Sequence, residues 1–481
     1  MQKNVLFYVV ILLVFGAGIW FMLEKGADLT PAAAKEQVTA AAQPAGHEET
    51  GGLFETMTAN LRHPLGMLLL QVLIIVIAAR SLGSLFRRIG QPPVIGEMVA
   101  GILLGPSLFG WLAPVAHSFV FPAASLGSLQ MLSQVGVILF MFVVGIELDV
   151  EHLRQKADAA VLVSHASIVV PFFLGVACAL VLYPPLAPAG VPFSAFALFL
   201  GVSMSVTAFP VLARILEERR MSKSFLGTTA IACAAVDDVT AWCLLAVVVA
   251  LAKASGVGAA LWTIGLSILF IAAMLLIVRP WLARLVRERT GPWGGSTGLL
   301  AGIFVFLFAS SLVTEMIGIH ALFGAFLAGV CMPPDPGLRQ FLRERLETFA
   351  SVFLLPLFFA FTGLRTQIGL LNDWQSWLMC LGVIAVAVAG KLGGSMMAAR
   401  WTGMSWMDSF SLGTLMNTRG LVELIVLNIG FDLGILSPRI FAMLVLMALV
   451  TTFMTGPLLS LVLWLRRKSL VAAAPGAMNV I

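Results

Sequence analysis

The sequence contains few charged residues. Aspartate, glutamate, lysine and arginine make up 11% of the 481 residues, whereas hydrophobic residues make up 60%. Soluble globular chains carry about 25% charged residues, so this composition excludes a soluble protein. The net charge of +5 does not indicate nucleic-acid binding, because the basic residues of a membrane protein must first be assigned to one side of the bilayer.

Cysteines are also scarce, and all five lie inside apolar runs: Cys178, Cys233, Cys243, Cys331 and Cys380. None belongs to a Cys-x-x-Cys pair or to a cysteine/histidine cluster. The spacing therefore predicts buried neutral thiols rather than a disulfide framework or a metal cluster.

Apolar runs of membrane-spanning length dominate the chain. A helix needs about 20 apolar residues to cross the hydrocarbon layer, and open sheets cannot satisfy their backbone there. The sequence thus predicts an all-α polytopic membrane protein with fourteen candidate spans, of which 320–333 is the shortest. They are 5–23, 64–81, 92–110, 125–147, 159–183, 194–214, 226–251, 258–279, 296–317, 320–333, 349–364, 374–398, 407–430 and 438–465.

The first run is separated from the others by a polar, alanine-rich stretch at 24–62. Its long apolar core and the lack of a small-x-small site directly after it favour a retained anchor over a cleaved signal peptide. The predicted organisation is an anchor or signal segment at 1–23, an extracytoplasmic linker at 24–62, a membrane domain of thirteen core helices at 64–467, and a short cytoplasmic tail at 468–481.

The basic residues indicate the orientation. If the C-terminus is inside, 21 of the 29 lysines and arginines lie on the inner side and six on the outer side, while Lys391 and Arg419 fall within spans. This asymmetry obeys the positive-inside rule. We therefore expect a multi-pass protein of a bacterial inner membrane with its C-terminus in the cytoplasm.

Two glycine patterns recur seven spans apart, counting from residue 64. Gly96–Gly101 in span two matches Gly324–Gly329 in span nine, and the phenylalanine-rich end of span three at Gly145 matches that of span ten at Gly363. A shift by an odd number of spans reverses the direction across the membrane. The pattern therefore predicts an inverted repeat of spans one to six and eight to thirteen.

Asp237 and Asp238 lie in the middle of the run 226–251. A charge at this depth costs about 2.5–3.5 kcal/mol on insertion scales, so intramembrane charges are functional candidates. Adjacent helical residues point about 100° apart; one carboxylate can therefore face a cation and the other a water-filled path. Burial and like charge favour protonation, so at least one is expected to exchange a proton for a metal ion. The competing explanation is that both merely neutralise Lys391 and Arg419 for packing.

Lys391 is flanked by Gly390 and Gly393, and small neighbours allow another helix to approach closely. We expect its ammonium to pair with one of the aspartates; the alternative is a lysine that snorkels to the inner surface. Arg419 and Glu423 are spaced i, i+4 and can neutralise each other. A structural ion pair and a transport role both remain open for them.

Spans five and twelve, equivalent in the two repeats, are both interrupted. Span five places Ser205 and Thr207 before Pro210, which lacks a backbone donor, and span twelve has a polar centre between Gly413 and Gly420. Matching interruptions indicate a binding site at the membrane midplane. There, freed carbonyls and the oxygens of Ser205 and Thr207 can ligate a hard cation; otherwise these residues only kink ordinary spans.

Four segments resemble the monovalent cation:proton antiporters, in the branch that contains the Kef-type potassium efflux systems and the plant cation/proton exchangers. The segments are Gln91–Glu97, Ser205–Arg214, Val236–Trp242 and Thr418–Gly430. The resemblance covers about residues 64–467. It departs from the Kef-type pattern in two respects: the chain ends about fourteen residues after Arg467, before any cytosolic nucleotide-binding domain, and the first hydrophobic segment is extra.

The resemblance implies a sodium/proton-antiporter-like fold and a homodimer. Spans one to three and eight to ten would form the dimerisation domain, and spans four to six and eleven to thirteen a mobile core. Asp238 would bind the cation or the proton, Thr207 would help to hold the ion, and Asp237 would pair with Lys391. The partners would be Na⁺ or K⁺ and protons, with no cofactor, no nucleic acid and no enzymatic activity.

The predicted mechanism is antiport by competition at one site. A proton or a monovalent cation neutralises the charge of Asp238. The empty site keeps its negative charge, and moving that charge through the low-dielectric barrier costs free energy. The alternative is a proton-coupled or gated, channel-like potassium efflux system. An intramembrane aspartyl protease is disfavoured, because such enzymes use aspartates on different helices, one of them in a Gly-x-Gly-Asp setting, whereas Ala235, Val236 and Asp237 precede Asp238 here. An organic-anion symporter is disfavoured by the scarcity of unpaired basic residues.

Overall fold

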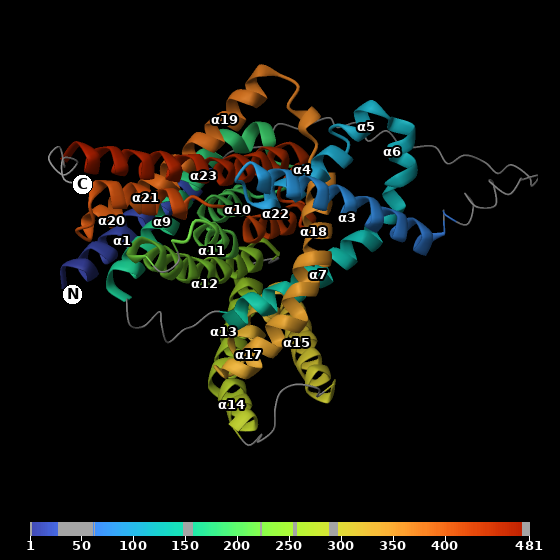
Figure 1. The fold of residues 1–481 in the computed structure, drawn as a ribbon, viewed down its shortest axis with the longest axis horizontal. Coiled ribbons are helices and arrows are strands. Elements are labelled where there is room, and N and C mark those ends of the chain that lie inside the picture. Colours follow the sequence, from blue (N-terminus) through green and yellow to red (C-terminus); the bar gives the residue numbers. More distant parts are fainter. Residues whose placement is uncertain are drawn as a thin grey trace, which may run out of the picture.

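The chain is helical over the residues that the computed structural model describes, which are 2–26, 61, 63–147, 157–221, 224–253, 257–287 and 297–473, and no strand occurs among them. Figure 1 shows the resulting bundle, from which α13, α14 and α15 project. The helices of the first half are α1 (Gln2–Gly26), α3 (Pro64–Arg88), α4 (Pro93–Leu104), α5 (Phe109–Leu112), α6 (Pro114–Val120), α7 (Leu126–Glu147), α9 (Ala157–Leu186), α10 (Phe193–Ser205), α11 (Phe209–Glu218) and α12 (Phe225–Lys253). Those that follow are α13 (Val257–Ala273), α14 (Arg279–Arg287), α15 (Thr297–Ile317), α16 (Ala321–Val330), α17 (Pro336–Leu342), α18 (Leu355–Arg365), α19 (Trp374–Val388), α20 (Gly394–Trp401), α21 (Trp406–Met416), α22 (Leu421–Asp432) and α23 (Pro438–Ala473).

The described helices correspond to all fourteen predicted runs. Twelve segments are long and apolar enough to cross a membrane, and the pair α21–α22, bent by 44°, raises the number to thirteen. The remaining run, predicted at 320–333, contains α16, which has ten residues. Ten helical residues rise only about 15 Å, so α16 alone is shorter than a full span. The prediction of an all-α membrane protein with two discontinuous helices is confirmed.

Prolines begin helices more often than they break them. Pro64, Pro93 and Pro210 lie in the first turns of α3, α4 and α11, where the missing N–H has no intrahelical partner to lose. The sequence predicts an interruption around Pro210, and the structure shows its form: α10 ends, three extended residues follow, and Pro210 starts a new half-helix.

The helices form two groups, and most helix–helix contacts lie within one group or the other. The first, called the scaffold here, consists of α3, α4, α7, α15, α16 and α18. The second, called the core, consists of α9 to α12 and α19 to α23. α13 and α14 follow the last core helix of the first half and lead to α15. The extra helix α1 packs on α9 of the core, where the rings of Phe15 and Phe173 meet edge to face with centroids 4.8 Å apart.

Glycines reveal the inverted repeat inside the scaffold. A Cβ at Gly101 of α4 would collide with the backbone of Ala360 on α18, and one at Gly329 of α16 would collide with the backbone of Phe142 on α7. These two crossings use the residues that match between the halves. Because α4 corresponds to α16 and α7 to α18, each crossing is the counterpart of the other, and both need glycine for backbone contact.

We expect Gly329→Ala to destabilise the scaffold, because overpacking a close-packed crossing costs about 1–3 kcal/mol. Gly302→Ala on α15 is the matched control, since a Cβ there meets no atom within 4 Å. Thermal unfolding of the purified protein in detergent should show a lower Tm for Gly329→Ala alone. An equal Tm for the two variants would contradict the crossing described here.

Candidate functional site

The two interrupted helices cross where each is unwound. Between α10 and α11 the chain is non-helical at residues 206–208, and between α21 and α22 at 417–420. The backbone N–H of Ala208 donates to the carbonyl of Thr418 at 3.0 Å, and the Thr207 hydroxyl lies 3.2 Å from the carbonyl oxygen of Met416. The two unwound stretches thus hold each other through backbone groups that neither helix can use.

Asp237 is surrounded by donors. Its Oδ1 accepts a hydrogen bond from Ser164 at 2.5 Å. Its Oδ2 accepts hydrogen bonds from Ser167 at 2.8 Å and from Thr207 at 2.6 Å, and pairs with Lys391 Nζ at 3.0 Å. The donors come from α9, from the unwound stretch and from the segment between α19 and α20. Asp237 is therefore fixed by three hydroxyl groups and one ammonium group.

Lys391 lies in a π-helical turn, Ala389–Gly393, between α19 and α20. Its side chain is fully buried and also donates to the carbonyl of Ser167 at 2.9 Å and to the carbonyl of Ser205. Three acceptors thus match the three N–H bonds of the ammonium group. Gly390 permits this arrangement, because a Cβ there would lie about 3 Å from Pro171 and Leu174 of α9.

The surroundings of Asp238 differ from those of Asp237. It is fully buried, yet neither of its carboxylate oxygens has a hydrogen-bond partner among the described residues. The backbone N–H of Phe209, the first residue of α11, faces it. A buried carboxylate without donors is costly, so this position favours a state in which a proton or a cation satisfies the carboxylate.

Arg419 binds the end of α10. Its guanidinium donates to the carbonyls of Ser203 and Met204, each at 2.6 Å, and lies 3.3 Å from Glu423 Oε2, as the i, i+4 spacing predicts. Lys391 takes the next carbonyl, that of Ser205. Two cations therefore satisfy the last three carbonyls of a half-helix that ends inside the membrane, where the helix dipole favours positive charge.

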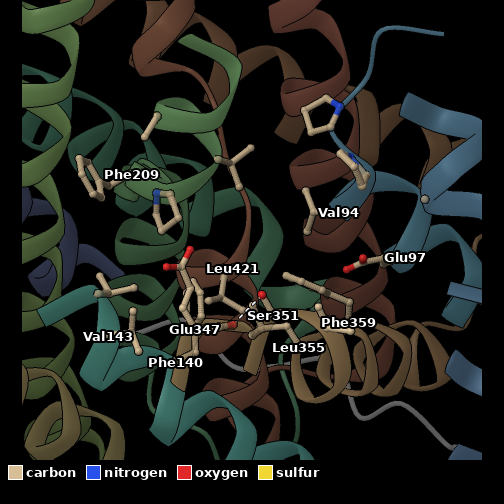
Figure 2. Close-up of a pocket in the computed structure, with 18 of the residues that line it drawn as sticks. Val94, Glu97, Phe140, Val143, Phe209, Glu347, Ser351, Leu355, Phe359 and Leu421 are labelled. Atoms are coloured by element: carbon tan, nitrogen blue, oxygen red, sulfur yellow. Dashed lines mark hydrogen bonds between the residues drawn. The ribbon is translucent and has the colours of Figure 1, made fainter. Parts of the chain in front are cut away.

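A cavity of about 790 Å³, called the vestibule here, separates core from scaffold on one side of the site. Figure 2 shows Phe209 and Leu421 of the core on its left and centre, and Val94 and Glu97 of the scaffold on its right. Its lining also includes charged side chains: Arg80, Arg87, Glu147, Glu217, Arg343 and Glu347. The vestibule thus reaches the start of α11, whose first N–H faces Asp238.

A buried aromatic contact joins core to scaffold one helical turn after Asp238. Trp242 lies one turn after Asp238 on the same face of α12 and is 2% exposed. Its ring stacks on Phe326 of the scaffold helix α16, with centroids 6.1 Å apart and planes at 23°. This contact packs the core helix α12 against the scaffold helix α16, on the part of α12 that follows Asp238.

The structure shows where the hydroxyl groups of Thr207 and Ser205, both predicted as ion ligands, lie. The Thr207 hydroxyl contacts Asp237, and the Ser205 hydroxyl donates to the carbonyls of Gly201 and Ile168, so that Ser205 reaches the site through its carbonyl. Sequence reasoning missed Ser164 and Ser167. Their signal is weak: two hydroxyls spaced i, i+3 in an otherwise apolar span.

Two further acidic side chains lie outside this cluster. Glu97 lines the vestibule from the scaffold. Glu315 accepts a hydrogen bond from the backbone N–H of Ala321 at 2.8 Å and so binds the start of α16. The described residues contain no group of three or more histidine, cysteine, aspartate or glutamate side chains that could hold a metal ion.

Known proteins share the sequence and the fold. The family "Sodium/hydrogen exchanger, transmembrane" matches residues 72–465. The Na⁺/H⁺ antiporter NhaS4 of Synechocystis is 44% identical over 393 residues, which are 82% of this chain and 96% of that protein. The K⁺/H⁺ antiporter 1 of Saccharomyces cerevisiae is 35% identical over 84% of this chain, but this chain covers only 47% of that longer protein.

The fold is also similar to a solved structure. The sodium proton antiporter MjNhaP1 from Methanocaldococcus jannaschii at pH 8 superimposes with a TM-score of 0.58 at 14% identity, covering 82% of this chain and 96% of the other. Together with the paired glycine crossings and the two unwound helices, this likeness supports the inverted-repeat fold predicted from the sequence.

We expect Asp237→Asn to unfold at a markedly lower temperature, because removing one partner of a buried ion pair costs about 3–5 kcal/mol. Adding Lys391→Met should recover part of the loss, since the uncompensated ammonium is then removed. Asp373→Asn is the control, because the side chain of Asp373 is 48% exposed in its pair with Arg439. If the double variant were no more stable than Asp237→Asn, the pair would not be the source of the effect.

Proposed function

We propose that this chain, which belongs to the sodium/hydrogen exchanger family of cation/proton antiporters, exchanges Na⁺ or K⁺ for protons. Exchange would occur by alternating access, with the cation and the proton competing for Asp238. Members of this family are transporters rather than enzymes. The observation that carries the proposal is the contrast between the two adjacent aspartates. Asp237 is satisfied by four donors, whereas Asp238 has none among the described residues.

The charges buried in the core support a single exchangeable charge. Asp237, Asp238 and Glu423 face Lys391 and Arg419, and all five side chains are fully buried. With every group ionised, one negative charge is uncompensated. One proton or one monovalent cation neutralises it, and only the neutral core crosses a low-dielectric barrier cheaply. Both ligands meet this requirement equally, which is the physical basis of competition.

The surroundings of Asp238 favour a carrier over the channel-like alternative. A channel needs a continuous water path. The vestibule reaches the start of α11, and we infer that access is from this side only, because the stacked rings of Trp242 and Phe326 pack core against scaffold one turn after Asp238. Access from one side at a time is what alternating access requires.

We further propose that the vestibule opens to the cytoplasm of a bacterial cell and that the protein is a homodimer. Arg80, Arg87 and Arg343 at the vestibule belong to the loops that the positive-inside rule assigns to the cytoplasm. The scaffold helix α3 exposes a stripe of apolar residues, Leu65, Leu69, Leu73 and Ile77, to lipid or to a second copy. A mass measurement in lipid nanodiscs that finds only single chains would contradict the dimer.

Asp238→Asn should abolish exchange without damaging the fold, because no side chain among the described residues donates to this carboxylate. The measurement is the release of protons from vesicles on addition of Na⁺ or K⁺. We expect background release for Asp238→Asn, normal release for the control Asp373→Asn, and no loss of Tm for either. Substantial cation-stimulated release by Asp238→Asn would overturn the proposal.

Competition also makes a quantitative prediction for the native protein. As the pH falls below the range in which Asp238 ionises, the deprotonated fraction falls, and the half-saturating cation concentration should rise by about tenfold per pH unit. The rate at saturating cation should change far less over the same range. A fall in the maximal rate at constant half-saturation would instead indicate a regulatory proton away from the ion site.

A further inference from the structure

One face of the half-helix α22 is directed at the scaffold near the end of the helix. Asn428, Phe431 and Asp432 are spaced i, i+3 and i+4, so they share this face. The start of α22 lies at the vestibule, where Leu421 is part of the lining. The twelve residues of α22 span about 18 Å. The contacts described next therefore lie at the opposite end of α22 from the vestibule.

Arg365, the last residue of the scaffold helix α18, contacts all three residues of this face. Its Nη1 lies 2.7 Å from Asp432 Oδ1 and donates to Asn428 Oδ1 at 3.2 Å. Its guanidinium lies 4.3 Å from the ring centroid of Phe361 on α18 and 5.3 Å from that of Phe431 on α22. Arg365 is thus held between an aromatic ring of the scaffold and one of the core.

Two further scaffold side chains complete the contact. Asn428 Nδ2 donates to the hydroxyl of Thr362 at 2.8 Å, and Gln130 of α7 donates to Asp432 Oδ2 at 3.2 Å. Both oxygens of Asp432, and both polar atoms of the Asn428 side chain, therefore have scaffold partners. The side chains of Arg365 and Asp432 are only 17% and 32% exposed, so water screens their pairing less than it would on an open surface.

The half-helix α22, which Arg365, Gln130 and Thr362 hold at its end, begins at the ion site. The pair Arg419–Glu423 joins its first turn to the unwound stretch that precedes it, and Thr418 in that stretch accepts a hydrogen bond from the backbone N–H of Ala208. If the core moves relative to the scaffold to open the side opposite the vestibule, α22 moves with it. The contacts of Arg365, Gln130 and Thr362 with α22 must then break.

We propose that Arg365 is a latch residue, which with Gln130 and Thr362 holds α22 against the scaffold and stabilises the conformation open to the vestibule. The inference rests on the proposed exchange function and extends it: the latch sets the ratio of the two conformations and therefore the apparent cation affinity on each face. Asp432 and Asn428 are its partners on the core. Releasing the latch increases the population open to the opposite, outer face.

Arg365→Gln tests the latch, and Asp432→Asn tests it from the other partner. Exchange is measured in right-side-out and inside-out vesicles over a range of Na⁺ and K⁺ concentrations. Releasing the latch should lower the half-saturating concentration at the outer face by about threefold or more and raise that at the inner face, because apparent affinity scales with the competent fraction. A variant that is merely less stable would lose maximal rate without moving the two faces in opposite directions.

Arg439→Gln is the matched control. It removes the same charge near the same end of the molecule, but from a pair with Asp373 at 3.8 Å, which joins the starts of two core helices. It should leave both half-saturating concentrations unchanged. Unchanged values for Arg365→Gln and Asp432→Asn, or shifts in the same direction on both faces, would overturn the latch.

Hydrogen–deuterium exchange provides a readout that does not need transport. In lipid nanodiscs, Arg365→Gln should speed backbone amide exchange at the ends of α18 and α22 and slow it around the start of α11. Arg439→Gln should leave the exchange rate in both regions unchanged. Unaltered exchange in both regions would refute the latch even if no cation flux were measurable. A native protein without cation-stimulated proton release would refute the proposed function alone.

Discussion

The site depends on how the structure ends a helix inside a membrane. The last carbonyls of α10 have no intrahelical donor, and no water is present in hydrocarbon to replace one. Lys391 and Arg419 donate to the last three of these carbonyls. The two cations in turn need counter-charges, which Asp237 and Glu423 supply. Asp238 remains outside this compensated group, and for this reason we propose it as the carboxylate that exchanges its ligand.

Hydropathy and glycine spacing predicted much of this architecture. The spans, their inversion and both interruptions follow from local patterns, because each depends on residues close together in the chain. The partners of Asp237 and Arg419 do not. Ser164 and Ser167 look like ordinary helical hydroxyls, which usually bond their own backbone, as Ser203 and Thr240 do here. That they face an aspartate some 70 residues away depends on how α9 packs against α12.

Arg419 illustrates the same limit. Its spacing predicts Glu423 as a partner, and the pair is present. The carbonyls that it binds belong to Ser203 and Met204 in the other repeat, more than 200 residues earlier, and no local pattern reports such a contact. Arg365 is one of the six basic residues that the predicted orientation places on the outer side. An arginine against the general charge asymmetry is explained by its bonds to α22.

The arithmetic of the buried charges has an electrical consequence. A cell's voltage acts on whatever net charge moves with the core, and a full elementary charge crossing 100 mV corresponds to about 2.3 kcal/mol. With a proton or a cation bound, the cluster of buried charges formed by Asp237, Asp238, Glu423, Lys391 and Arg419 has no net charge. The membrane voltage then does little work on it. In the proposed mechanism the vacant cluster retains one negative charge, so the membrane voltage would shift the balance between the two empty conformations and with it the face at which the next ion binds.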